Sequence, residues 1–212
     1  MSRKNEIRNK ELIENKPYLT KIELSLLLDK KGKNLDKKIT QLIRDETIIP
    51  LKRGLYTSRI FYLKNKENIE EYLANSIYYP SYLSMEYVLT KENIIPETVY
   101  SYTSVSLKTT RNFTNKLGNF TYKKIKEKLF TGYYQKDYFE NCRIKIATRA
   151  KALFDFLYFK TEKTLRELGD FRINWQNITS NDLDEFSMYI DMSQSAKMKK
   201  AYTLIKKEYD KR

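Results

Sequence analysis

Histidine is absent from this 212-residue chain. Its absence removes the commonest general base of enzymes, the Ser/His and Cys/His nucleophile pairs, and most zinc sites. Any catalysis would have to rest on carboxylates, lysine or tyrosine. Glycine is scarce too: five residues are scattered along the chain, and none of them forms a glycine-rich phosphate-binding loop. We therefore expect no enzymatic activity, no catalytic residues, no metal ligands and no cofactor.

Cysteine and long apolar runs are almost missing as well. The single cysteine, Cys142, cannot form a disulfide within the chain and is most simply a small core residue of a strand. The N-terminus lacks the apolar segment of a signal peptide, and no apolar run approaches the roughly 20 residues that cross a bilayer. We expect a cytoplasmic protein with no membrane partner.

Positive charge is what the sequence has in excess, with a formal net charge of +14 and a pI of about 9.5. Residues 1–60 hold 15 Lys/Arg and 8 Asp/Glu, and residues 195–212 hold 7 Lys/Arg and 2 Asp/Glu. The middle of the chain is nearly neutral. Two basic ends favour a polyanionic partner such as nucleic acid. The alternative is a lysine-rich surface that reflects a biased genome, which would spread the charge more evenly.

The first 60 residues predict three short helices. The first covers residues 3–15 and ends before Pro17. Thr20 begins the second, with Glu23 at the spacing of a capping box. The third covers residues 35–46, with Asn34 as its cap. The apolar residues expected on the buried side of the second helix are Ile22, Leu24, Leu26, Leu27 and Leu28.

The third helix is followed by two short strands, ETIIPL and GLYTS. Gly54 suits the positive φ of the hairpin turn between them, and Pro50 restricts its strand to a sheet edge. At about 100° per residue the helix separates two faces. One is a core stripe of Leu35, Ile39, Leu42 and Ile43, and the opposite one carries Lys37, Thr40, Gln41 and Arg44.

Three helices followed by a hairpin are typical of a winged helix-turn-helix. Its recognition helix reads base edges in the major groove, and its wing contacts phosphates. The residues expected to bind DNA are Lys33, Asn34, Lys37, Lys38, Thr40, Gln41, Arg44, Lys52 and Arg53. The alternative is an ordinary solvated helix whose polar face binds nothing.

The remaining sequence predicts a different kind of domain. Strands are expected in ETVYSYTSVS, NFTYKKI, TGYYQ and CRIKIAT, and helices over residues 68–77, 82–91, 148–160, about 180–190 and 194–210. The segment ALFDFLYF is apolar almost all round and should be a buried helix. We expect an α+β fold: a winged helix-turn-helix domain over 1–65 and a mixed α/β domain over 66–212 that ends in a basic helix.

Three further features leave alternatives open. The last helix carries Lys199, Lys200, Lys206 and Lys207, which are either solvated or a surface for nucleic acid or an acidic protein. Asp182, Asp184 and Glu185 could hold a metal, although acidic residues also favour a helix start. The tyrosine-rich stretch SIYYPSYLSMEY is either core or a stacking platform for single strands.

Four segments resemble, in this order, AbiEi-type antitoxins of type IV toxin–antitoxin systems: YPSYLSMEYVL, ENIIPETVYSYTSVSLKTTRNF, GNFTYKKIKEKLFTGYY and IATRAKALFDFLY. The resemblance spans roughly residues 48–160. The matching residues include Tyr82, Ser84, Pro96, Glu97, Arg111, Gly118, Tyr122, Gly132, Ala147, Lys151 and Ala152. The chain departs from the family at Arg149 and Ala150, where Pro and Glu are usual, and there Thr148 could still cap the helix.

The resemblance implies a bacterial antitoxin that binds inverted repeats in its own promoter through the winged helix and represses its operon. It further implies that the C-terminal domain counteracts a nucleotidyltransferase-like toxin, commonly without a stable complex. The leading hypothesis is this antitoxin, with promoter DNA and the toxin as partners. The alternatives are a free-standing winged-helix regulator with a ligand- or protein-sensing C-terminal domain, and a metal enzyme that uses Asp182 or Asp184.

Overall fold

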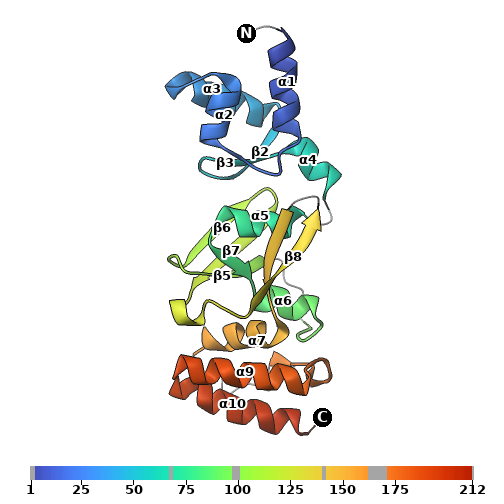
Figure 1. Cartoon of the computed structure of the whole chain (residues 1–212), viewed down its shortest axis with the longest axis vertical. Helices are drawn as coiled ribbons and strands as arrows, with labels where there is room; N and C mark the ends of the chain where they lie inside the picture. Colours follow the sequence, from blue (N-terminus) through green and yellow to red (C-terminus); the bar gives the residue numbers. More distant parts are fainter. Residues whose placement is uncertain (1–2, 67–68, 97–100, 140–141, 162–170, 212) are drawn as a thin grey trace. The chain divides into compact units, whose positions relative to one another are not determined.

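The computed structural model describes residues 3–66, 69–96, 101–139, 142–161 and 171–211. The fold is mixed α+β, as the sequence predicted (Figure 1). The chain forms two compact units, residues 1–77 with 113–119, and residues 78–112 with 120–212. The sequence placed the boundary at residue 65 instead, because polarity was the only signal available there.

The first unit combines helices with a small sheet. Its elements are α1 (Arg3–Glu14), β1 (Leu19–Thr20), α2 (Lys21–Leu28), α3 (Gly32–Arg44), β2 (Ile48–Lys52), β3 (Leu55–Ser58), α4 (Arg59–Lys64) and α5 (Ile69–Ile77). The three strands are antiparallel and lie in the order β1-β3-β2. β2 is therefore an edge strand, which agrees with Pro50, because proline has no N–H to donate to a further strand. Gly54 has a φ of 76° in the β2–β3 turn.

Local capping determines where α2 begins. The Thr20 hydroxyl accepts the Glu23 N–H at 3.2 Å, and the Glu23 carboxylate accepts the Thr20 N–H at 2.8 Å, which confirms the predicted capping box. Burial acts to raise the pKa of Glu23, but hydrogen bonds from Lys16 and Thr20 outweigh it, so the pKa lies below its ordinary value. The predicted cap of α3 is wrong. The Leu35 N–H already bonds to the Lys31 carbonyl, which places Asn34 inside the first turn.

One hydrophobic cluster of the first unit is aliphatic, apart from one tyrosine. It consists of Ile13, Leu19, Leu24, Leu35, Ile39, Ile48 and Tyr56, with Leu27, Leu28, Leu42 and Ile43 packed against it. The predicted burial of Ile22 and Leu26 is wrong, because their side chains are 75% and 77% exposed. They lie one turn apart on the side of α2 opposite Leu24, and Leu24 is the residue that α2 buries completely.

The second unit contains most of a six-stranded mixed sheet in the order β6-β7-β5-β4-β9-β8; residues 113–119, at the turn between β6 and β7, are grouped with the first unit. Its strands are β4 (Ser81–Leu83), β5 (Ser101–Ser106), β6 (Arg111–Asn115), β7 (Gly118–Lys124), β8 (Tyr133–Phe139) and β9 (Cys142–Ala147). β4 pairs with β5 in antiparallel and with β9 in parallel orientation. The helix predicted over 82–91 is thus wrong at its start, since Leu83 pairs with Ser104 and Ile146 inside the sheet.

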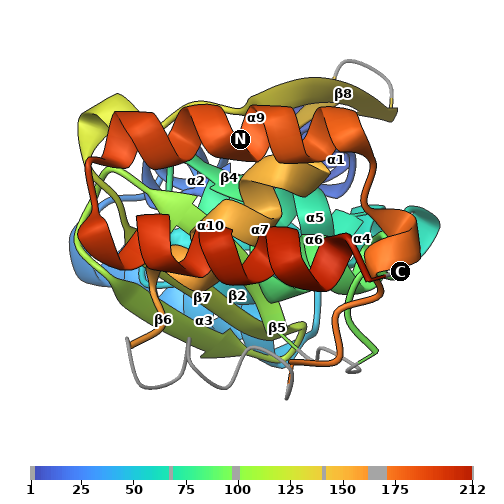
Figure 2. The same cartoon turned by 90° about the horizontal axis from the view of Figure 1, so that it is seen from below.

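The helices of this unit lie in layers against the sheet. They are α6 (Glu86–Lys91), η1 (Glu127–Leu129), α7 (Arg149–Tyr158), η3 (Trp175–Asn177), α9 (Ser180–Ser193) and α10 (Ala196–Tyr209). α9 and α10 run side by side over α7, and α7 lies between them and the sheet (Figures 1 and 2). Residues 150–157 of α7 are all buried, which confirms the prediction of a buried helix.

An ion pair lies inside this buried helix. The Lys151 Nζ is 2.5 Å from the Asp155 Oδ1, and both side chains are fully buried. The Asp155 Oδ2 accepts hydrogen bonds from the Tyr82 hydroxyl at 2.9 Å and the Ser84 hydroxyl at 2.7 Å. Burial lowers the pKa of Lys151 and raises the pKa of Asp155, and the attraction between the two charges opposes both shifts. The pair therefore joins α7 to β4 and the turn that follows it.

We predict that Asp155→Ala lowers the free energy of unfolding by about 3–5 kcal/mol, because Lys151 would stay buried without a counter-charge. The double variant Lys151→Met/Asp155→Leu should lose clearly less, since it removes both charges and keeps most of the volume. Urea unfolding followed by circular dichroism measures both. An Asp155→Ala loss no larger than that of the double variant would contradict a role for charge pairing.

Candidate nucleic-acid interface

The outer face of α3 is polar, basic and exposed. Lys33, Asn34, Lys37, Thr40, Gln41 and Arg44 are all exposed, and Lys38 is half-buried. On the opposite side Leu35 and Ile39 are buried in the core. The structure therefore brings the seven α3 residues of the predicted interface to the surface of one helix, because the core stripe occupies the other side.

These side chains differ in how they are held. The Lys38 ammonium donates to the Gln41 amide oxygen at 3.0 Å, and the Thr40 hydroxyl donates to the Asp36 carbonyl at 2.9 Å. Lys33 and Lys37 make no side-chain hydrogen bond or ion pair with the part of the chain that the structure describes. These two ammonium groups are thus the ones most readily available to an anion.

The one carboxylate within α3 is neutralised from the neighbouring helix. The Lys21 Nζ of α2 lies 2.5 Å from the Asp36 Oδ1 of α3. Because this ion pair removes the repulsion that Asp36 would exert on a phosphate, the surface keeps its positive character. Both side chains are about half exposed, so the pair contributes little to stability.

The two basic residues of the β2–β3 turn have different environments. Arg53 is exposed at the turn. Lys52 is half-buried, donates its ammonium to the carbonyl of Ile77, and lies 5.8 Å from the ring centre of Phe113. The sequence could not reveal this, since Ile77 and Phe113 are distant along the chain. Of the two, only Arg53 is presented to solvent as the prediction required.

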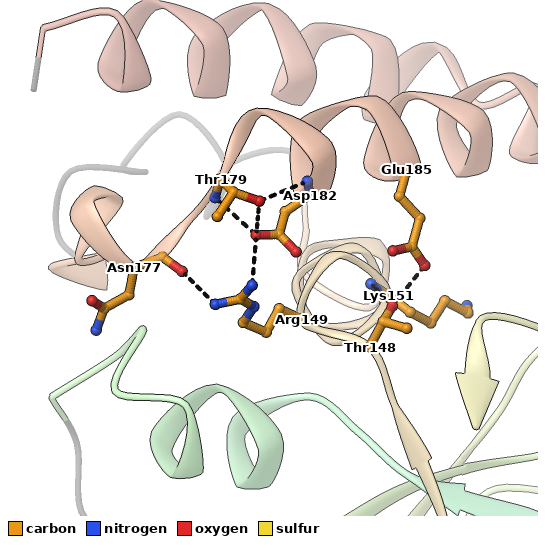
Figure 3. Close-up of polar contacts among 7 residues, drawn as sticks. All are labelled: Thr148, Arg149, Lys151, Asn177, Thr179, Asp182 and Glu185. Carbon is orange, nitrogen blue, oxygen red and sulfur yellow. Dashed lines mark hydrogen bonds and ion pairs between the residues drawn. The ribbon is translucent and has the colours of Figure 1, made fainter. Parts of the chain in front are cut away.

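Two of the three acidic residues near the start of α9, Asp182 and Glu185, have structural partners (Figure 3). Asp182 forms a capping box with Thr179 and lies 3.4 Å from the Arg149 guanidinium. Glu185 accepts hydrogen bonds from the Thr148 hydroxyl at 2.7 Å and the Tyr189 hydroxyl at 2.5 Å. Among the described residues no group of three His, Cys, Asp or Glu side chains could hold a metal.

The structure shows the contacts of Thr148 and of Arg149, a position at which the sequence departs from the antitoxin pattern that it resembles. Thr148 caps α7 by accepting the Lys151 N–H at 3.1 Å, as the sequence predicted. Arg149 reaches the Asn177 carbonyl at 3.4 Å in addition to Asp182 (Figure 3). This residue thus contributes contacts between α7 and the segment that leads into α9.

The lysines predicted on the last helix, Lys199, Lys200, Lys206 and Lys207, are all exposed on α10. Sequence reasoning missed Lys197, whose ammonium donates to the Tyr158 carbonyl at 2.5 Å and the Lys160 carbonyl at 2.8 Å. Lys197 therefore caps the C-terminal end of α7, where carbonyl groups lack partners within the helix.

Several residues of the antitoxin resemblance meet in one place. Tyr82 and Ser84 bond to Asp155, the ion-pair partner of Lys151. A Cβ added to Gly132 would lie 2.1 Å from the Tyr189 hydroxyl oxygen and 2.9 Å from Lys151 Cγ, so this position requires glycine. Sequence reasoning missed Asp155, although an acid inside ALFDFLYF, four residues after a lysine, was a usable signal.

The structure also places the single cysteine and the tyrosine-rich stretch. Cys142 is half-buried in β9. In the tyrosine-rich stretch Tyr78 and Tyr82 are buried, which favours a core role for them over a stacking platform, whereas Tyr79 is exposed. Glu97 lies outside the described residues, as does the first part of the strand predicted from it.

Comparison with known proteins provides no assignment. The chain matches no protein-family model, and a search of curated proteins finds no match to it. Within the described residues, no helix is long and apolar enough to cross a membrane.

We predict that Lys52→Ala lowers the free energy of unfolding by about 1 kcal/mol, because it removes a charged hydrogen bond to the Ile77 carbonyl. Arg53→Ala, the neighbouring exposed position, should stay within about 0.5 kcal/mol of the parent chain. Thermal and urea unfolding measure both. Equal effects of the two substitutions would contradict the distinction between an anchoring lysine and a solvent-facing arginine.

Proposed function

We propose that the chain is a cytoplasmic DNA-binding antitoxin that represses its own operon. The observation that carries the DNA-binding part is α3, whose buried stripe leaves a basic face exposed. The element order α1-β1-α2-α3-β2-β3 and the strand order β1-β3-β2 support a winged helix-turn-helix. In this proposal α3 enters the major groove and the β2–β3 turn is the wing.

The side chains then divide by role. Arg44, Gln41 and Lys37 can present bidentate or charged donors to base edges, and Thr40 adds a hydroxyl. Lys33 and Asn34, near the helix start, and Lys38, on the flank of the outer face, contact phosphates, as does Arg53 on the wing. Lys52 positions the wing through Ile77 and Phe113 instead of meeting DNA.

The antitoxin part of the proposal concerns the second unit. It is supported by the resemblance of the four segments and by the way Tyr82, Ser84 and Lys151 contact Asp155, with Gly132 next to Lys151. We propose that this unit counteracts a nucleotidyltransferase-like toxin without being an enzyme. The exposed lysines of α10, Lys199, Lys200, Lys206 and Lys207, are the surface through which it acts.

DNA binding is tested by a gel-shift series on the chain's own upstream region at several salt concentrations. The triple variant Lys37→Ala/Gln41→Ala/Arg44→Ala should lose about 3 kcal/mol or more of specific binding, because each good base contact contributes roughly 1–3 kcal/mol. Unchanged specific binding by this variant would refute α3 as the recognition helix.

A matched control comes from the second unit. Lys126→Ala/Gln135→Ala/Lys128→Ala removes the same charge from exposed positions outside the interface and should leave binding unchanged. Arg53→Ala should weaken binding to all sequences alike and reduce the salt slope by about one, because a phosphate contact carries no sequence information.

Antitoxin activity is tested by co-expression. If a nucleotidyltransferase-like gene lies next to this one, its induction should arrest growth, and co-expression of the present chain should restore it. Lys199→Ala/Lys200→Ala/Lys206→Ala/Lys207→Ala should rescue less well while retaining operator binding. No rescue by the parent chain would remove the antitoxin part of the proposal and leave a DNA-binding regulator.

A further inference from the structure

A cavity of about 670 Å³ opens among the helices of the first unit. Its floor consists of four aliphatic side chains, Ile13 from α1, Leu27 and Leu28 from α2, and Leu42 from α3. The other lining residues are polar or charged: Asn9, Lys10, Asp29, Lys30, Lys38 and Thr47. A volume of this size is within the range of small-molecule sites.

The floor favours an aliphatic occupant. Leu27, Leu28 and Leu42 pack against the core but are only partly buried, so a part of each remains uncovered. Covering that surface is favoured by the hydrophobic effect. Because the apolar lining residues are all aliphatic, the floor has no ring on which an aromatic ligand could stack.

The rim favours a negative charge. Three lysines, Lys10, Lys30 and Lys38, line the cavity against a single acid, Asp29. Lys10 lies 3.7 Å from Glu14, and Lys38 donates to Gln41. The Lys30 ammonium makes no hydrogen bond or ion pair with any residue that the structure describes. Lys30 is therefore the rim cation that an anionic ligand would engage first.

The walls are held in place by hydrogen bonds. The Asn9 amide donates to the Leu27 carbonyl at 2.6 Å and joins α1 to α2. The Ser25 hydroxyl donates to the Lys30 carbonyl at 2.7 Å, and the Lys30 N–H donates to the Ser25 carbonyl at 3.2 Å. This preorganised turn fixes the backbone that carries Lys30, which reduces the cost of binding.

We propose that this cavity binds a straight-chain aliphatic carboxylate, with its tail on the leucine floor and its carboxylate at the lysine rim. Lys38 belongs both to this rim and to the phosphate contacts of α3. A carboxylate that engages Lys38 therefore competes with DNA, and the bound ligand weakens operator binding. This second step rests on the proposed function, whereas binding of the carboxylate does not.

The test is calorimetric titration of the full chain with sodium decanoate, hexanoate and acetate, and with 1-decanol as the uncharged probe. Decanoate should bind one-to-one, hexanoate more weakly, and acetate not at all, with affinity rising about fourfold for each methylene that becomes buried. Decanol should bind clearly more weakly than decanoate. Absence of saturable decanoate binding, or equal binding of decanol, would overturn the proposal.

Two neighbouring charge reversals locate the site. Lys30→Glu should weaken decanoate binding roughly fivefold or more, because the cation that would pair with the ligand's carboxylate is replaced by a negative charge that repels it. Lys31→Glu changes the next exposed residue, which does not line the cavity, and should bind decanoate as the parent does. Equal affinities of the two variants would place the ligand elsewhere.

The coupling to DNA is read from gel shifts with and without saturating decanoate. The ligand should lower operator affinity for the parent chain and for Lys31→Glu, and much less for Lys30→Glu at the same concentration. Decanoate binding with unchanged operator affinity would overturn the coupling. A chain that binds no DNA at all would refute the proposed function, while the titration would still decide the ligand site.

Discussion

The buried ion pair of Lys151 and Asp155 is the constraint on which the second unit depends. Two charges removed from water destabilise a fold by several kcal/mol each unless they are paired and hydrogen-bonded. The pair forms within α7, between residues one turn apart, but it leaves the second oxygen of Asp155 to be satisfied. Only Tyr82 and Ser84 satisfy it among the described residues, so α7 has one favourable position on the sheet.

The position of α7 on the sheet determines which residues pack around the ion pair. β4, which carries Tyr82, lies between β5 and β9, so the helix is seated over the middle of the sheet. The ring centres of Phe154, in α7 itself, and Tyr189, in α9, lie 4.8 and 5.2 Å from the Lys151 ammonium. Gly132 leaves the space that Tyr189 and Lys151 occupy. Four residues of the antitoxin resemblance, Tyr82, Ser84, Gly132 and Lys151, are therefore explained by packing.

In the first unit, the helix α3 packs into the core with one side and exposes the opposite side to solvent. Leu35 and Ile39 are the buried residues of α3, and they lie on the side opposite its basic residues. Because the inner and outer residues alternate at the helical period, the outer lysines can be changed without disturbing the core. The same helix also contributes Leu42 and Lys38 to the lining of the neighbouring cavity.

The sequence by itself determined the features that depend on a few adjacent residues. These are the Thr20–Glu23 capping box, the Thr148 cap, the turn at Gly54, the edge position of Pro50 and the two faces of α3, since each rests on local geometry. Tertiary structure alone decided that Ile22 and Leu26 are exposed, that β4 replaces the start of a predicted helix, and that Lys52 turns to Ile77. It also decided that Tyr82 and Ser84 meet Asp155. Each of these outcomes depends on which distant parts of the chain approach a residue and which do not, and no local pattern encodes that approach.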